Sequence, residues 1–85
     1  MRLPLIKYIN SFIADNDEDY VKEAITVLEY LTESSAVKDE EIDVIGELLS
    51  NLYGGLEVAQ MVKQGKSEKE AGNIFMKRVL GSIDQ

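Results

Sequence analysis

The chain has 85 residues, 16 of them acidic and 9 basic, which gives a net charge of −7. It contains no cysteine and no histidine. This excludes a disulfide framework and a thiol nucleophile, and it removes both the commonest general base near neutral pH and the commonest transition-metal ligand. We therefore expect a non-enzymatic protein with no cofactor and no catalytic or metal-binding residues. Because the chain is short, we expect one helical domain over residues 1–85 with a modest stability margin.

The charge is distributed unevenly along the chain. Residues 1–62 hold 13 acids against 4 bases, whereas residues 63–85 hold 5 bases against 3 acids. An acidic body repels phosphate backbones, so we expect no nucleic-acid partner. The apolar patch at the amino terminus is too short for a signal peptide, and no apolar run is long enough to cross a membrane. We expect a cytoplasmic protein that binds neither nucleic acid nor membrane.

Two helices are predicted in the first third of the chain. Pro4 suits a first helical position, and the helix ends in the run Asp15-Asn16-Asp17. Asn16 or Asp17 then caps a second helix, which a loop over residues 32–37 follows. The first helix carries Leu5, Ile6, Ile9, Phe12 and Ile13 on one side, and the second carries Val21, Ala24, Ile25, Leu28 and Leu31 on its inner face.

A long third helix is predicted from about Asp39 to about Gln64. Its apolar residues recur at alternate spacings of three and four, which keeps them on one face: Ile42, Ile45, Leu49, Leu52, Leu56 and Ala59. An unbroken helix of this length would reach roughly 39 Å. A compact domain of 85 residues is only about 30 Å across. Either the helix bends, or a partner covers its end.

Gly54 and Gly55 interrupt this helix, and each costs about 1 kcal/mol relative to alanine in a helix interior. Gly55 falls beside the apolar face, where it would admit close approach of another helix, whereas Gly54 is expected on the opposite side. Two alternatives stay open here. We favour a continuous helix that is bent or weakened at the pair, over a full break into two helices.

The fourth helix has the sharpest local signal. Gly65 is expected to end the third helix in a left-handed conformation, and Ser67 with Glu70 forms a predicted capping box. The expected buried side consists of Ala71, Ile74, Phe75 and Val79, extending to Ile83. Since no run alternates as a strand does, the chain is predicted to be all-α, a small bundle of four helices.

Carboxylates at Asp15, Asp17 and Asp19 alternate as at the opening of a calcium loop. The pattern then fails, because Tyr20 stands where glycine is needed and Thr26 where the closing glutamate is needed. We interpret the segment as a helix junction. The sequence leaves open whether the acidic helix faces bind a metal ion.

The stretches Asn16-Asp17-Glu18-Asp19-Tyr20-Val21 and Asp39-Glu40-Glu41-Ile42-Asp43-Val44-Ile45-Gly46-Glu47-Leu48 resemble a family of small, acidic, all-helical bacterial proteins of unknown function. The resemblance spans most of the chain. It implies a bacterial, cytoplasmic origin, but it brings no activity, cofactor or residue role.

Excess apolar surface leads to a functional hypothesis. The third helix has more apolar residues than one narrow seam can use, so we predict a homodimer formed through this helix with help from the first. The alternative is an adaptor or regulatory subunit that binds another protein through an apolar groove or an acidic face. The predicted interface comprises Leu5, Ile9, Phe12, Leu48, Leu52, Tyr53, Gly55, Leu56, Ala59 and Val62.

Overall fold

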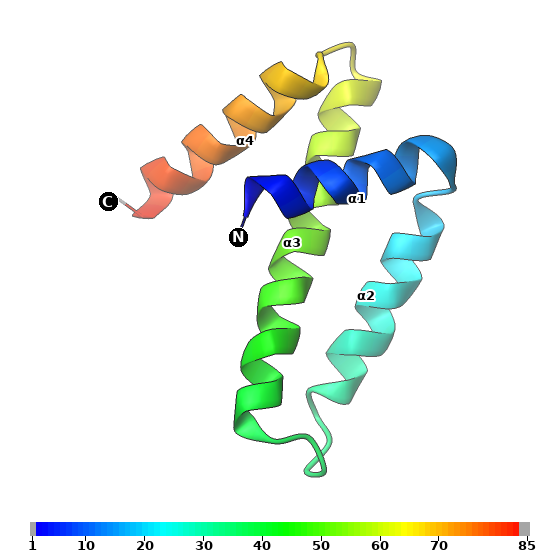
Figure 1. The fold of residues 1–85 in the computed structure, drawn as a ribbon, viewed down its shortest axis with the longest axis vertical. Helices are drawn as coiled ribbons and strands as arrows, with labels where there is room; N and C mark the ends of the chain where they lie inside the picture. The colour runs from blue at the N-terminus through cyan, green and yellow to red at the C-terminus, as the bar shows by residue number, and fades with distance from the viewer. Residues whose placement is uncertain (1, 84–85) are drawn as a thin grey trace.

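A computed structural model describes the backbone of residues 2–83 and the side chains of residues 2–80, and within this part the chain is helical without strands. The all-α prediction is confirmed. The four helices are α1 (Leu3–Asp15), α2 (Asp19–Leu31), α3 (Asp39–Lys63) and α4 (Glu68–Ile83). Figure 1 shows α3 as the central element, with α1 crossing it, α2 along its first half and α4 beside its second half.

The helix ends follow the local signals in the sequence. Gly65 has a φ of 105°, and its N–H donates to the Val62 carbonyl at 3.0 Å while the Lys66 N–H donates to the Met61 carbonyl at 3.2 Å. These two bonds form a Schellman motif, which ends α3 as predicted. The Ser67 hydroxyl accepts from the Glu70 N–H at 3.1 Å and so caps α4.

The two junctions before α2 and α3 are closed by carboxylates. Asp17 Oδ1 accepts from the Asp19 N–H at 3.0 Å and so binds the first residue of α2, although the capping position itself is Glu18 and not Asn16 or Asp17 as predicted. At the start of α3, Glu41 Oε1 accepts from the Lys38 N–H at 2.9 Å. In each case a negative charge lies at the positive end of a helix, where it is stabilised.

Helix α3 runs without interruption through Gly54 and Gly55 for 25 residues, so the alternative of a full break is wrong. The glycines instead allow neighbouring helices to approach. A Cβ on Gly55 would lie 2.5 Å from Ile9 Cγ2 of α1, and one on Gly54 would lie 3.0 Å from Ile6 Cδ1 and from Phe75 Cζ. The assignment of Gly54 to a face without a neighbour is therefore also wrong. Side chains of α1 and α4 both contact α3 at Gly54.

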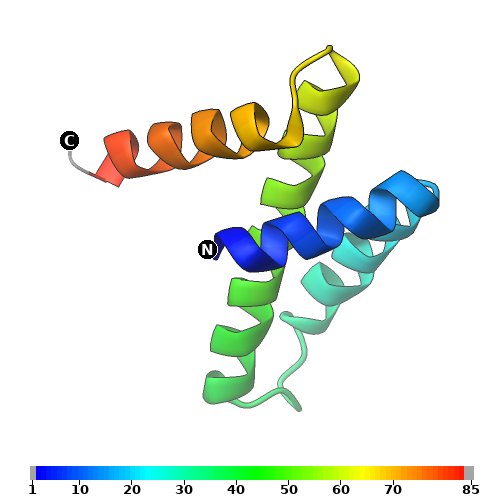
Figure 2. The ribbon, with the colours of Figure 1, turned by 45° about the horizontal axis from the view of Figure 1, so that its top comes forward.

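The core lies at one end of the molecule, where α1 and α4 both contact the second half of α3 (Figure 2). Its fully buried members are Ile6, Val58, Ala71 and Phe75, with Met61, Val62, Met76 and Val79 packed against them. Val21 and Ile25 of α2 are also buried. The predicted apolar side of α3 faces α2, since Lys63, one turn beyond Ala59, pairs with Glu18.

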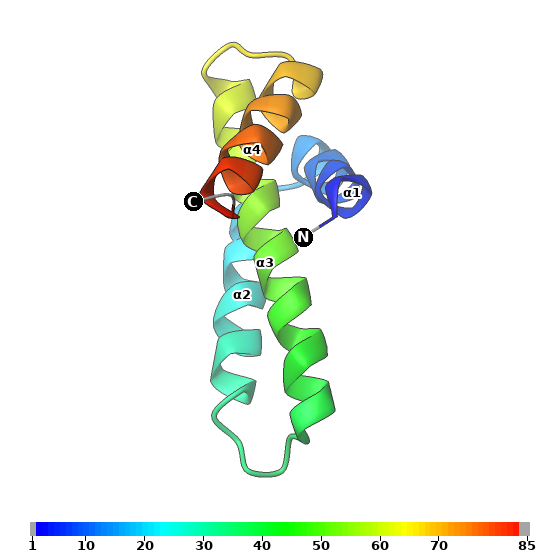
Figure 3. The same cartoon turned by 90° about the vertical axis from the view of Figure 1, so that its left-hand side faces the viewer.

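The molecule is flat and open. It measures 43 × 35 × 17 Å, and its radius of gyration is 13.8 Å, compared with about 12 Å for a compact chain of this length. In side view, α1 stands forward of the layer that contains α2 and α3 (Figure 3). A long α3 in a small chain is accommodated by this open shape.

Several residues predicted on inner faces are exposed instead. Ala24 and Leu31 of α2 face solvent, and Leu31 is 41% exposed. Ile74 of α4 is 44% exposed, because α4 contacts α3 mainly through Ala71 and Phe75. Ile83 lies outside the described side chains. These side chains are exposed for one reason: α2 and α4 each have only one neighbouring helix along most of their length.

Candidate protein interaction surface

Two buried asparagines fix α1 across α3. Asn10 Nδ2 donates to the Gly55 carbonyl at 3.0 Å and to the Ile6 carbonyl at 3.1 Å. Asn51, which is 1% exposed, accepts the Arg2 N–H at 2.9 Å and donates to the Glu47 carbonyl at 2.8 Å. Buried polar groups that keep their hydrogen bonds specify one geometry. Therefore α1 is held at a defined position on α3.

The side of α3 that faces α1 continues below the crossing without a cover. Val44, Leu48, Asn51 and Gly55 are spaced by four, three and four, so they share one side of the helix. Asn51 and Gly55 are buried beneath α1. Val44 and Leu48 lie beyond it and remain 57% and 44% exposed.

Helix α2 extends this uncovered apolar surface. Tyr20, Ala24, Val27 and Leu31 have the same four, three, four spacing and are all exposed. The Tyr20 ring meets the Phe12 ring of α1 edge to face, with centroids 6.1 Å apart, so this side of α2 faces the same way as α1. The sequence analysis missed this stripe because it predicted Ala24 and Leu31 on the inner face. The pattern that could have revealed it is a second set of residues at helical spacing, which lies on a different side of the helix from Val21 and Ile25.

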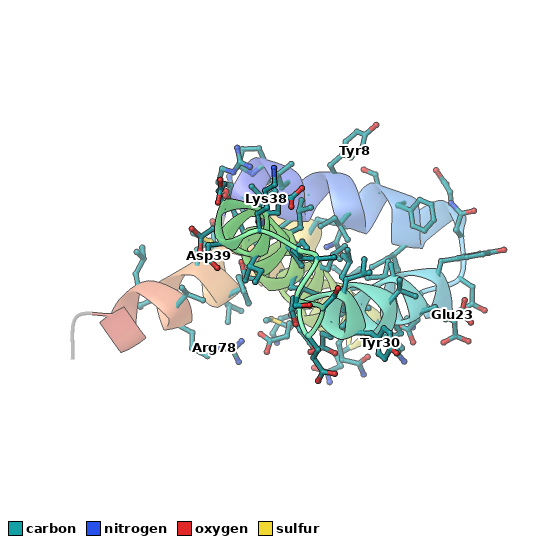
Figure 4. The ribbon with its side chains drawn as sticks, turned by 90° about the horizontal axis from the view of Figure 1, so that it is seen from below. Tyr8, Glu23, Tyr30, Lys38, Asp39 and Arg78 are labelled. Carbon is teal, nitrogen blue, oxygen red and sulfur yellow. The ribbon has the colours of Figure 1, made fainter. Side chains whose placement is uncertain are left out.

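We call this surface the apolar shelf, defined as Ala24, Val27 and Leu31 of α2 with Val44 and Leu48 of α3. Helix α1 bounds one end of it, and its outer residues Leu5, Tyr8 and Phe12 form what we call the α1 wall. Tyr8 is 78% exposed and projects outward from α1 (Figure 4). Where wall and shelf meet, a nearly apolar hollow of about 280 Å³ is lined by Tyr8, Ile9, Phe12, Tyr20, Val21 and Leu52.

The opposite side of the α2 and α3 pair is polar. Tyr53 donates its hydroxyl to Glu29 Oε2 at 2.8 Å, and this hydrogen bond to a carboxylate raises the pKa of Tyr53. Glu18 lies 3.0 Å from Lys63 Nζ, and the hydrogen bond with Lys63 lowers the pKa of the Glu18 carboxyl. The Tyr53–Glu29 bond joins α2 to α3 on the face away from the shelf, whereas the Glu18–Lys63 pair joins the start of α2 to the end of α3. The face away from the shelf is thus closed by a polar contact, and the shelf face is apolar.

The structure brings half of the predicted interface together. Leu5, Ile9, Phe12, Leu48 and Leu52 lie on the shelf, on the wall or in the hollow between them. Gly55 and Ala59 are buried within the chain, and Tyr53 lies on the polar side. Leu56 and Val62 are half-buried, and Val62 packs against the core.

A second hollow, of about 330 Å³, lies between α3 and α4 and is lined in part by Gly54, Phe75 and Val79. At its edge Arg78 pairs with Glu57 and lies over the Phe75 ring at 5.6 Å from the centroid. The two charged groups at this hollow therefore pair with each other.

The described residues contain neither a metal-binding group of acidic side chains nor a membrane-spanning helix. Within residues 2–83, no group of three or more acidic side chains gathers closely enough to hold a metal ion. None of the helices in that range combines the length and apolar character that a membrane crossing requires.

Comparison with known proteins places the chain without assigning a role. No curated protein and no solved structure matches it. Residues 1–84 match a family described as "Family of unknown function (DUF6952)". The expectation of a family without known function is confirmed, whereas the bacterial origin stays a prediction. The chain therefore belongs to the DUF6952 family of unknown function.

Proposed function

We propose that this protein is a non-enzymatic, cytoplasmic helical protein that forms a homodimer through the apolar shelf and the α1 wall. The observation that carries the proposal is the accessible surface of the single chain, which is 6047 Å². A monomeric protein of 9.5 kDa exposes about 5,000 Å². The excess of roughly 1,000 Å² matches the area of about 800 Å² that each partner buries in a complex of standard size.

The composition of the shelf supports the same conclusion. Its five residues are uncharged, and neighbouring residues of the shelf come from two helices that pack against each other. Contiguous apolar patches larger than a few hundred Å² are uncommon on monomeric soluble proteins and mark interaction sites. The absence of histidine and cysteine in the whole sequence supports a non-enzymatic role.

A second copy fits this surface better than a basic protein partner does. A basic partner would be recognised by carboxylates, and none of the five shelf residues carries one. Two copies of a chain with net charge −7 repel each other, so the driving force between them must be apolar burial. Raising the salt concentration screens this repulsion and should strengthen a homodimer, whereas it would weaken an acidic adaptor bound to a basic partner.

The test is sedimentation equilibrium over a range of concentrations, with two matched variants. Val27→Glu places a carboxylate on the shelf, and Thr26→Glu places the same charge on the other side of α2. We expect the wild-type chain to be dimeric at tens of micromolar. An unpaired carboxylate in a buried interface costs several kcal/mol, so Val27→Glu should weaken association more than about 100-fold. Thr26→Glu should leave it within a few fold.

Three outcomes would contradict the proposal. They are a wild-type monomer at these concentrations, a dimer that both variants weaken equally, and a dimer that dissociates as salt is raised. A wild-type monomer that retains a basic protein only at low salt would favour the adaptor alternative.

A further inference from the structure

We propose that the two copies pack antiparallel about a two-fold axis, with α2 against α2 and α3 against α3 of the partner, and with the end of each shelf against the α1 wall of the other. This inference rests on the proposed homodimer. It adds the arrangement of the two copies, which the position of α1 determines.

The wall limits how a second shelf can approach. Helix α1 packs on α3 and stands forward of the layer of α2 and α3 (Figure 3). Helices pack with their axes about 8–10 Å apart, so a partner that contacts the shelf must occupy the same layer as α1. The partner therefore lies beside α1, on the side of the 32–38 loop.

Two face-to-face orientations are then possible, and the position of the wall decides between them. If both copies point the same way, their two α1 helices meet at the same end. They hold the shelves apart by an additional helix diameter of about 10 Å, and the shelves stay uncovered. If the copies are antiparallel, each wall lies beyond the loop end of the other copy. Both shelves are then covered, and the two α1 helices do not meet.

The residues of the shelf suit the antiparallel orientation. The α2 stripe is centred on Val27, with the small Ala24 on one side and the large Leu31 on the other. A two-fold axis near Val27 places Ala24 opposite the partner's Leu31 at both ends, so small side chains meet large ones. On α3, the wall begins where α1 covers Asn51 and the loop end is at Asp39, so the point midway between them lies next to Val44. Val44 therefore lies near the same axis.

Single cysteines test this arrangement directly, because the natural sequence contains none. Val27→Cys and Val44→Cys are made separately, with Thr26→Cys as the matched control on the other side of α2. Each is treated, alone and in an equimolar mixture, with a short bismaleimide whose reach suits helices packed at about 8–10 Å. Sedimentation of each reduced variant shows whether it still dimerises.

The antiparallel arrangement predicts that Val27→Cys and Val44→Cys each cross-link with themselves, while Thr26→Cys does not. In the same-direction arrangement α2 faces α3 of the partner, and the α1 helices hold the shelves beyond the reach of the reagent. A dimer that cross-links only in the mixture of Val27→Cys with Val44→Cys would overturn the inference while leaving the homodimer intact. Dimers in which neither shelf variant cross-links would also overturn it. Monomeric wild-type protein would instead contradict the proposed function.

Discussion

The two halves of α3 differ in how they use the side that faces α1. Above and at the crossing, this side holds the small or polar residues Asn51, Gly54 and Gly55, and all three are buried. Below the crossing it holds the large apolar residues Val44 and Leu48, and both are exposed. The covered half has small residues that let another helix approach, whereas the uncovered half offers apolar surface that the chain itself leaves open.

This difference separates folding from association within one helix. The covered half holds α1, α3 and α4 together through the core around Phe75 and through the two asparagines. On the side that faces α1, the uncovered half contributes little to the stability of the single chain, since Val44 and Leu48 remain exposed. Substitutions in the two halves should therefore change different measured quantities.

The largest effect is expected in the covered half. Phe75 is 3% exposed, and Phe75→Ala should lower the free energy of unfolding by about 3–5 kcal/mol, a large part of the stability of so small a domain. Leu48→Ala, measured at concentrations where the chain is monomeric, should change it by less than about 0.5 kcal/mol. Urea denaturation measures both. Similar losses in the two variants would show that the halves are not distinct.

The hydrogen bonds of the crossing come next. Asn51→Ala leaves the Arg2 N–H and the Glu47 carbonyl without their buried partner, so it should cost about 1–3 kcal/mol. Asn73 is exposed on α4, and Asn73→Ala should fall within about 0.5 kcal/mol of the wild type. Equal stability of the two variants, by the same denaturation, would contradict the role of Asn51 in holding α1.

Glycine substitutions sharpen the comparison within α3. Gly55→Ala would place a methyl group 2.5 Å from Ile9 Cγ2, and because Ile9 is β-branched and stiff, α1 must shift. Overpacking costs about 1–3 kcal/mol and the gain in helix propensity is about 1 kcal/mol, so we expect a net loss of up to about 2 kcal/mol.

Gly46 provides the control, since nothing lies within 4 Å of a Cβ placed there. Gly46→Ala should raise the stability by up to about 1 kcal/mol through helix propensity alone. Thermal unfolding followed by circular dichroism compares the two. A stabilising Gly55→Ala would mean that α1 does not lie as close to α3 as the structure has it.

The smallest effect concerns pH. Lys63 lowers the pKa of Glu18 in the folded chain, so the ion pair stabilises the fold above the ordinary pKa of a glutamate. This contribution is lost as the pH falls through the lowered folded pKa. Both side chains lie near the surface, so the loss should be slight. Glu18→Gln should reduce the drop in melting temperature between neutral and acidic pH, and an unchanged drop would contradict the assignment.

Local signals in the sequence predicted the helices well. Pro4, Gly65 and the hydroxyl of Ser67 act within a few residues of their own positions, so the ends of the helices follow from them. The structure brings only part of the predicted interface together, because the prediction assumed that the apolar side of α3 was free. That side faces α2, and the exposed stripe lies a quarter turn away, at Val44 and Leu48.

The sequence by itself determined the fold class, the number of helices and the long α3, because periodicity and capping are properties of one segment and its own backbone. Only the tertiary structure decided which apolar stripes are covered. Covering depends on the crossing of α1 over α3, which is fixed by contacts between residues some 45 positions apart, such as Asn10 and Gly55. A stripe that will be buried and a stripe that will face solvent can have the same spacing, and their difference arises only when a second helix lies against one of them.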